Sequence, residues 1–243
     1  EDTLSLHDAL PICCESNAYA DPKDEPRLGG TCLNVGCIPS KALLHTSHLF
    51  EEACHGFAVQ GITVGTPKID VPTMIERKNT IVKQLTTGIK GLFKKNKVTL
   101  LNGHGSFVAQ SDGGWQVKVG EELVEAKQVV VATGSRPRHL AGVAVDNVLV
   151  CDNVGALDIN AVPKKLAIIG AGVIGLEMGS VWRRLGAEVT ILEALPDFLS
   201  VADVDVAKEA AKVFRKQGLN IQLGVTIGEV KARSEERRVG KEC

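Results

Sequence analysis

The second half of the chain alternates between two kinds of hydrophobic pattern. Short runs rich in Val, Ile and Leu predict strands, and longer stretches with apolar residues every three or four positions predict helices. The strands are expected at 166–169, 188–192 and 220–223, and the helices at 173–185 and 201–217, the second of which ends at Gly218. Strands that alternate with helices are typical of an α/β fold with a parallel sheet.

The first half is less regular, but it contains one long amphipathic pattern and several short strand patterns. We expect the end of a strand at 13–15, helices from about 40 to 54 and from 70 to 95, and strands at 98–108 and 115–119. Asp70 is a suitable N-cap for the long helix, whose apolar stripe is expected to pack in a core. The β-branched run 127–132 shows no alternation, which predicts a strand buried on both faces of a parallel sheet.

Composition and charge narrow the class of protein. The chain has 243 residues, of which 44% are hydrophobic, and this is enough for one or two globular domains. Its net charge of -1 gives no reason to expect nucleic acid or an anionic membrane as a partner. No apolar run reaches the roughly 18 residues of a transmembrane helix. Scattered cysteines without a secretory signal favour the reducing cytoplasm.

The two ends of the chain have a different interpretation. Residues 233–243 can be encoded by a DNA string whose reverse complement, read in another frame, encodes residues 3–12. The string resembles a common sequencing adapter. We therefore expect residues 1–12 and 233–243 to be translated adapter, and the natural sequence to cover about 13–232 and to be truncated at both ends.

A cysteine pair in a glycine-rich segment carries the first candidate chemistry. Cys32 and Cys37 lie five positions apart, and Gly36 allows the chain to bend so that their sulfurs approach. The helical pattern that follows places Cys37 at a helix N-terminus, where the helix dipole stabilises a thiolate. This pattern favours a redox-active dithiol/disulfide. Two alternatives stay open, a zinc site completed by His45 and His48 and a purely structural disulfide.

A glycine motif carries the second candidate chemistry. Gly170, Gly172 and Gly175 form a GxGxxG sequence between a predicted strand and a predicted helix, and Glu193 ends the next predicted strand. In this context the motif predicts a dinucleotide site, with the pyrophosphate at the helix N-terminus and the adenosine ribose on the acid. No arginine occurs at 194–200, so the site favours NAD over NADP. The alternative is a glycine turn that binds no ligand.

Three segments, 29–41, 129–137 and 165–193, together resemble the pyridine-nucleotide disulfide oxidoreductases, and most closely the members that oxidise dihydrolipoyl groups. Mercuric reductases are also similar. Glutathione reductases usually carry a second lysine at the position of Ser40, and soluble transhydrogenases usually lack the cysteine pair. The resemblance implies an α/β fold with an incomplete FAD-binding Rossmann-like domain at 13–150, followed by a partial NAD-binding Rossmann-like domain at 151–232.

The resemblance also implies roles for individual residues. Cys32 would be the thiol that exchanges with the lipoyl substrate, and Cys37 would form the thiolate beside the flavin. Lys41 would lie near the flavin, paired with Glu177, and Glu15 would bind the adenosine ribose of FAD. The expected FAD-site residues are Glu15, Gly29, Gly30, Thr31, Lys41, Gly105, Thr133, Gly134 and Ser135, and the expected NAD-site residues are Gly170, Ala171, Gly172, Val173, Ile174, Gly175, Leu176, Glu177 and Glu193.

The activity implied by the resemblance is oxidation of dihydrolipoyl groups by the disulfide, with electrons passed through FAD to NAD. The implied partners are lipoyl groups of 2-oxo-acid dehydrogenase complexes or of the glycine cleavage system, and a second copy in a homodimer; no metal is implied. The family's first FAD-binding unit and its dimerisation domain have no counterpart here, so we expect the 243-residue chain to be inactive. The alternatives are a mercuric or glutathione reductase type of enzyme, or a truncated dinucleotide-binding module without activity.

Overall fold

The computed structural model describes residues 11–17, 19, 27–111, 113–228 and 230 of the chain. These residues form two compact units, one from residues up to 39 together with 79–136, and one from 40–78 together with the residues from 137 onward. Each unit has its own sheet structure. None of the helices in the described ranges combines the length and the apolar character that crossing a membrane requires.

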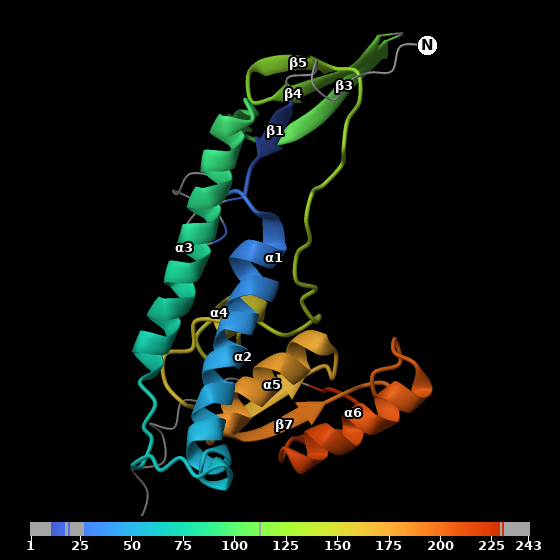
Figure 1. The fold of residues 1–243 in the computed structure, drawn as a ribbon. Coiled ribbons are helices and arrows are strands. Elements are labelled where there is room, and N and C mark those ends of the chain that lie inside the picture. Colours follow the sequence, from blue (N-terminus) through green and yellow to red (C-terminus); the bar gives the residue numbers. More distant parts are fainter. Residues whose placement is uncertain (1–10, 18, 20–26, 112, 229, 231–243) are drawn as a thin grey trace, which may run out of the picture. The chain divides into compact units, whose positions relative to one another are not determined.

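The strands of the first unit form two separate sheets (Figure 1). They are β1 (Ile12–Glu15), β2 (Thr99–Asn102), β3 (Gly105–Ser111), β4 (Gly114–Val119) and β5 (Glu122–Ala126). β1 and β2 pair in parallel, and β3, β4 and β5 form an antiparallel sheet. The range 98–108, expected as one strand, is divided because Gly103 has a φ of 149° and donates its N–H to the carbonyl oxygen of Glu15. The hydrophobic pattern does not predict β5.

Helical segments fill the sequence between β1 and β2. They are α1 (Gly30–Val35), α2 (Cys37–Glu51), a π-helical turn (Glu52–Gly56), a 3-10 turn (Ala58–Gln60) and α3 (Val71–Lys95). Asp70 caps α3 as expected, because its side chain accepts the N–H of Thr73 at 3.1 Å. The apolar stripe of α3 is only partly in a core. Val82 is buried, whereas Leu85 and Leu92 are 42% and 56% exposed.

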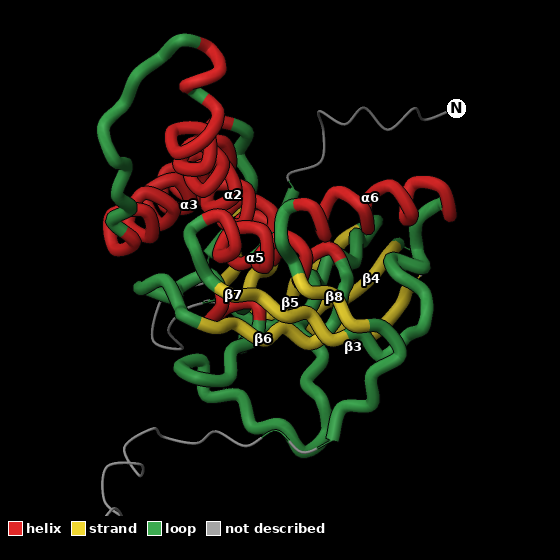
Figure 2. The backbone as a smooth tube through the Cα atoms, turned by 90° about the horizontal axis from the view of Figure 1, so that it is seen from below, coloured by secondary structure: helices red, strands yellow, loops and turns green. Residues whose placement is uncertain are grey.

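The second unit contains the alternating elements that the hydrophobic pattern predicts. They are β6 (Lys165–Ile169), α5 (Val173–Arg184), β7 (Glu188–Leu192), α6 (Val204–Lys216) and β8 (Asn220–Gln222). A short helix that the pattern does not predict, α4 (Asn153–Ala156), precedes them. The strands are parallel in the order β6–β7–β8, and α5 and α6 lie on the same side of this sheet (Figure 2). Val181, Val189 and Ile191 are fully buried. The arrangement confirms the expected partial Rossmann-like fold.

The buried strand expected at 127–132 is absent. These residues lie outside every strand, and Val130 and Val131 are 88% and 68% exposed. A β-branched run prefers a strand only when a neighbouring strand supplies hydrogen bonds and packing, and within the described residues no strand pairs with this run. The expectation of a buried strand is therefore wrong for this structure.

The end segments expected to be translated adapter fall mostly on residues 1–10 and 233–243, which lie outside the described residues. Ile12 is described and pairs with Thr99 at the start of β1. The adapter interpretation and the domain ranges 13–150 and 151–232 stay predictions.

Candidate functional site

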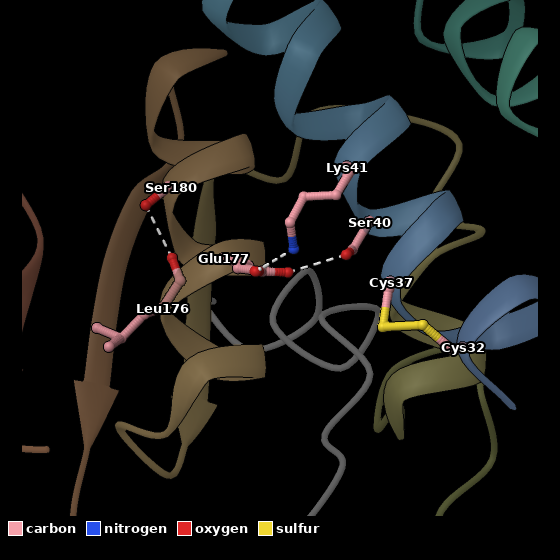
Figure 3. Close-up of polar contacts among 7 residues, drawn as sticks. All are labelled: Cys32, Cys37, Ser40, Lys41, Leu176, Glu177 and Ser180. Carbon is pink, nitrogen blue, oxygen red and sulfur yellow. Dashed lines mark hydrogen bonds and ion pairs between the residues drawn. A yellow bond between two sulfur atoms is a disulfide. The ribbon is translucent and has the colours of Figure 1, made fainter. Parts of the chain in front are cut away.

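The two cysteines of the glycine-rich segment are joined in a disulfide (Figure 3). Cys32 lies in α1 and Cys37 is the first residue of α2, and their Cα atoms are 4.7 Å apart. Gly36 separates the two helices, and a Cβ atom there would lie 3.1 Å from both the Cα of Cys32 and the carbonyl oxygen of Thr31. A larger residue at position 36 would therefore push the two cysteines apart. Because the sulfurs are bonded to each other, neither is a thiolate that could ligate zinc in this state.

A buried asparagine holds the segment that carries Cys32. Asn34 is 9% exposed, and its Nδ2 donates to the carbonyl oxygens of Leu28 and Gly30 at 3.1 and 2.9 Å. These bonds tie α1 to the residues that precede it. Sequence reasoning did not reveal this role, because an asparagine beside glycines is equally typical of an exposed turn.

The predicted FAD-site residues of α1 and of the turn at 133–135 come together in the first unit. The hydroxyl of Thr31 accepts the N–H of Ser135 and donates to its carbonyl oxygen, both at 3.2 Å, although 104 positions separate the two residues. Gly134 has a φ of 74°, and a Cβ atom there would lie 3.1 Å from the Thr31 hydroxyl. Thr133 is exposed in the same turn. This hydrogen-bonded contact places the turn beside the helix that carries Cys32.

The other predicted FAD-site residues of the first unit lie around β1 and the start of α1. Glu15 ends β1, and its Oε1 accepts the N–H groups of the next two residues at 3.0 and 2.9 Å. Gly105 lies beside β1, where a Cβ atom would be 3.8 Å from the Cβ of Cys14. At Gly30 a Cβ atom would meet nothing within 4 Å, whereas at Gly29 it would lie 2.8 Å from a side-chain carbon of the following turn. Gly30 therefore leaves room for a ligand, and Gly29 allows close packing.

Lys41 and Glu177, which are expected to pair, are in contact in the second unit (Figure 3). The Nζ of Lys41 lies 2.5 Å from Oε1 of Glu177, and the hydroxyl of Ser40 donates to Oε2 of the same carboxylate at 2.8 Å. Lys41 is 61% exposed, but Ser40 is buried and Glu177 is half-buried, so the carboxylate is partly shielded from water. Two consecutive residues of α2 thus hold one carboxylate of α5. Sequence reasoning used Ser40 only to set the chain apart from glutathione reductases, and it did not reveal the hydroxyl as a partner of Glu177.

Two glycines of the turn between β6 and α5 are open, and two glycines within α5 are closely packed. A Cβ atom at Gly170, where φ is 102°, or at Gly172 would meet nothing within 4 Å. At Gly175 it would lie 2.2 Å from the carbonyl oxygen of Gly170, and at Gly179 it would lie 3.2 Å from a side chain of the sheet. The first two glycines leave the backbone accessible, and the last two let α5 approach the sheet.

The acid at the end of β7 is bound to this glycine turn. Oε2 of Glu193 accepts the N–H of Ala171 at 2.7 Å, and Oε1 accepts the N–H of Leu195 at 2.9 Å. The hydrogen bond from the Leu195 N–H lowers the pKa of the Glu193 carboxyl most, and the bond from the Ala171 N–H lowers it further. The carboxylate is therefore charged at neutral pH, and it keeps further acceptor positions for the hydroxyls of a ligand.

The second unit has features that favour a dinucleotide at the glycine turn. The open backbone of the glycine turn precedes a 12-residue helix, whose first N–H groups and dipole favour a pyrophosphate. Val173 and Ile174 are exposed at this helix end, whereas the side chains of Ala171 and Leu176 are buried. In the part of the chain that the structure describes, no three His, Cys, Asp or Glu side chains gather as a metal site.

Comparisons with known proteins give one consistent family. A family model described as pyridine nucleotide-disulphide oxidoreductase matches residues 17–242. The dihydrolipoyl dehydrogenase of Cupriavidus necator is 63% identical over 218 residues, which cover 90% of this chain and 46% of that protein. The mitochondrial dihydrolipoyl dehydrogenase 1 of Arabidopsis thaliana is 46% identical over 209 residues, covering 86% of this chain and 41% of that protein. The chain thus spans less than half the length of these two relatives.

Solved structures give the same picture of the fold. LpdA from Mycobacterium tuberculosis matches with a TM-score of 0.78 at 22% identity, over 93% of this chain and 54% of that chain. The flavoprotein disulfide reductase RclA from Escherichia coli matches with a TM-score of 0.69 at 25% identity, over 91% and 45%. Both likenesses support the α/β fold.

Proposed function

The chain belongs to the pyridine nucleotide-disulphide oxidoreductase family, and from this premise we propose that the complete protein acts as a dihydrolipoamide dehydrogenase. It would oxidise dihydrolipoyl groups and reduce NAD+. The observation that carries the proposal is the closed Cys32–Cys37 disulfide at the start of α2. The 63% identity with the dihydrolipoyl dehydrogenase of Cupriavidus necator supports the choice of substrate.

The disulfide would oxidise the dihydrolipoyl group by thiol–disulfide exchange. A thiolate of the dihydrolipoyl group attacks the sulfur of Cys32, and the sulfur of Cys37 leaves as a thiolate. The second substrate thiol gives its proton to solvent and attacks the substrate sulfur of this mixed disulfide, which closes the lipoyl disulfide and releases Cys32 as a thiolate. The two electrons then reside on the cysteine pair. Cys37 carries its charge at the first position of a 15-residue helix, where the helix dipole stabilises it.

The two cofactors would be held by the residues already located. When bound, FAD would carry the two electrons from the cysteine pair to NAD+. We assign the FAD site to Glu15, Gly29, Gly30, Thr31, Lys41, Gly105, Thr133, Gly134 and Ser135, and the NAD site to residues 170–177 and Glu193. The choice of NAD over NADP rests on Glu193, whose charged carboxylate would repel a 2′-phosphate.

We also propose the partners and the location of the complete protein. The substrate groups would be lipoyl groups of 2-oxo-acid dehydrogenase complexes or of the glycine cleavage system. The homodimer is proposed from the family membership. A cytoplasmic location is supported by the free state of Cys13, Cys14, Cys54 and Cys151.

The test of this function is turnover by the protein encoded by the complete gene. With dihydrolipoamide and NAD+, we expect NADH to form and to be measured by its absorbance. With NADP+ we expect kcat/KM to be about 100-fold lower, because the like charges of Glu193 and the 2′-phosphate repel each other.

The same assay with other substrates separates the alternatives. Activity with oxidised glutathione or mercuric ion, but none with dihydrolipoamide, would contradict the proposed substrate and support a related reductase. A protein that binds NAD but turns over none of these substrates would be a dinucleotide-binding module.

A further inference from the structure

We infer that Glu193 has a second role, which rests on the proposed dinucleotide site: it holds the glycine turn in the open conformation that accepts a pyrophosphate before any nucleotide is bound. Glu193 is thus a positioning residue for the phosphate end of the nucleotide. This role is additional to the contact with the adenosine ribose that the GxGxxG pattern predicts.

The contact that carries this inference lies between the two open glycines. The N–H of Ala171, which is buried, donates to Oε2 of Glu193 at 2.7 Å. The N–H of Gly170 donates to the carbonyl oxygen of Leu192 at 2.8 Å. Two successive residues of the turn, Gly170 and Ala171, are therefore hydrogen-bonded to two successive residues at the end of β7, Leu192 and Glu193. The carboxylate bond is charge-assisted and so is stronger than a bond between neutral groups.

Glu193 is itself held in place on three sides. Its backbone N–H donates to the carbonyl oxygen of Gln222 at 2.8 Å, and its carbonyl oxygen accepts the N–H of Val225 at 2.9 Å. Its second carboxylate oxygen accepts the N–H of Leu195. The side chain therefore connects the glycine turn to a fixed point of the sheet.

The glycines explain why the turn needs such an anchor. Gly170 and Gly172 have no side chain, and the space around both positions is open, so local packing restricts their backbone little. A turn that sampled several conformations would lose entropy on closing around a ligand. Fixing the turn during folding removes this cost from binding.

Strand β7 also provides a matched control. Glu188 lies at the other end of the same strand, and its side chain is 68% exposed. Its carboxylate forms an ion pair with Lys165, with 3.7 Å between Oε2 and Nζ. Glu188→Gln therefore removes the same charge from the same strand without touching the glycine turn.

The first experiment measures amide hydrogen exchange of the 243-residue chain without nucleotide. In Glu193→Gln and Glu193→Ala we expect the Ala171 amide to exchange at least about tenfold faster, because its charged acceptor is lost. The amides of Gly170 and of β7 should keep their protection, and Glu188→Gln should match the wild type. Unchanged protection of Ala171 in both variants would overturn the inference. An equal loss of protection across β6 and β7 would also overturn it, because the role would then belong to the whole sheet.

The second experiment separates the turn from the ribose contact. ADP and 2′,3′-dideoxy-ADP carry the same pyrophosphate, but only ADP has ribose hydroxyls for Glu193 to bind. If Glu193 holds the turn, Glu193→Gln weakens dideoxy-ADP binding about tenfold and ADP binding more. If it weakens ADP alone, Glu193 reads only the ribose and the inference fails. If the wild-type protein binds neither nucleotide, the proposed dinucleotide function fails, and the exchange measurement still decides the role in the turn.

Discussion

Replacing Cys37 with serine is expected to lower kcat/KM of the complete protein for dihydrolipoamide by at least about 10³-fold, because the reaction loses its two-electron acceptor. Serine cannot form a sulfur–sulfur bond with Cys32. Cys32 is then a free thiol, so the substrate thiolate has no disulfide to attack. The loss should therefore appear in kcat and not only in KM, measured as NADH formation.

The 243-residue chain offers a direct measurement of the same couple. After blocking of free thiols, reduction followed by alkylation should add two labels to the wild type, at Cys32 and Cys37, and none to Cys37→Ser. Cys54→Ser is the matched control, since Cys54 is a free cysteine in the π-helical turn. It should keep both labels. Labelling of Cys32 and Cys37 without reduction in the air-oxidised wild type would contradict a closed couple.

The two cysteines can also be assigned different roles. In the complete protein with FAD bound, Cys32→Ser leaves Cys37 as a thiolate, and we expect the long-wavelength absorbance of a thiolate beside a flavin. Cys37→Ser should lack this absorbance at every pH. The opposite result would exchange the roles proposed for Cys32 and Cys37, but it would leave the disulfide chemistry unchanged.

The second unit could be predicted from the sequence because its information is local. β6 and β7 are short runs rich in apolar residues, α5 and α6 have helical spacing, and β8 follows the helix end at Gly218, so most of the βαβαβ order follows from periodicity. The GxGxxG context then identifies the turn. What the pattern could not supply is the bond between Ala171 and Glu193, because the two residues are separated by a whole helix and strand.

The first unit was harder to predict because its elements depend on distant partners. The six-residue helix α1 begins at Gly30, a residue with low helix propensity, and it is held by Asn34, the disulfide and the contact of Thr31 with Ser135. The run 127–132 shows the converse. Its residues favour a strand, but in the described part of the chain no neighbour pairs with it.

Gly175→Ala and Gly172→Ala are expected to separate folding from binding within one turn. A Cβ atom at Gly175 would lie 2.2 Å from the backbone oxygen of Gly170, so the start of α5 must move away from the sheet. We expect a loss of about 3 kcal/mol of stability, typical of severe overpacking. For a chain of this length it should lower the Tm by about 10 °C, measured by circular dichroism.

Gly172→Ala is the matched variant, because it adds the same methyl group three residues earlier. The new Cβ atom would meet nothing within 4 Å, and the φ of -74° at this position suits alanine, so we expect a Tm within about 2 °C of the wild type. The methyl group would occupy the space into which a pyrophosphate must approach, so ADP affinity should fall at least about tenfold. If Gly172→Ala bound ADP as tightly as the wild type, the phosphates of the nucleotide would not lie against Gly172. A wild-type Tm in Gly175→Ala would mean that α5 can retreat without cost, and the close helix–sheet contact would then not be what requires glycine.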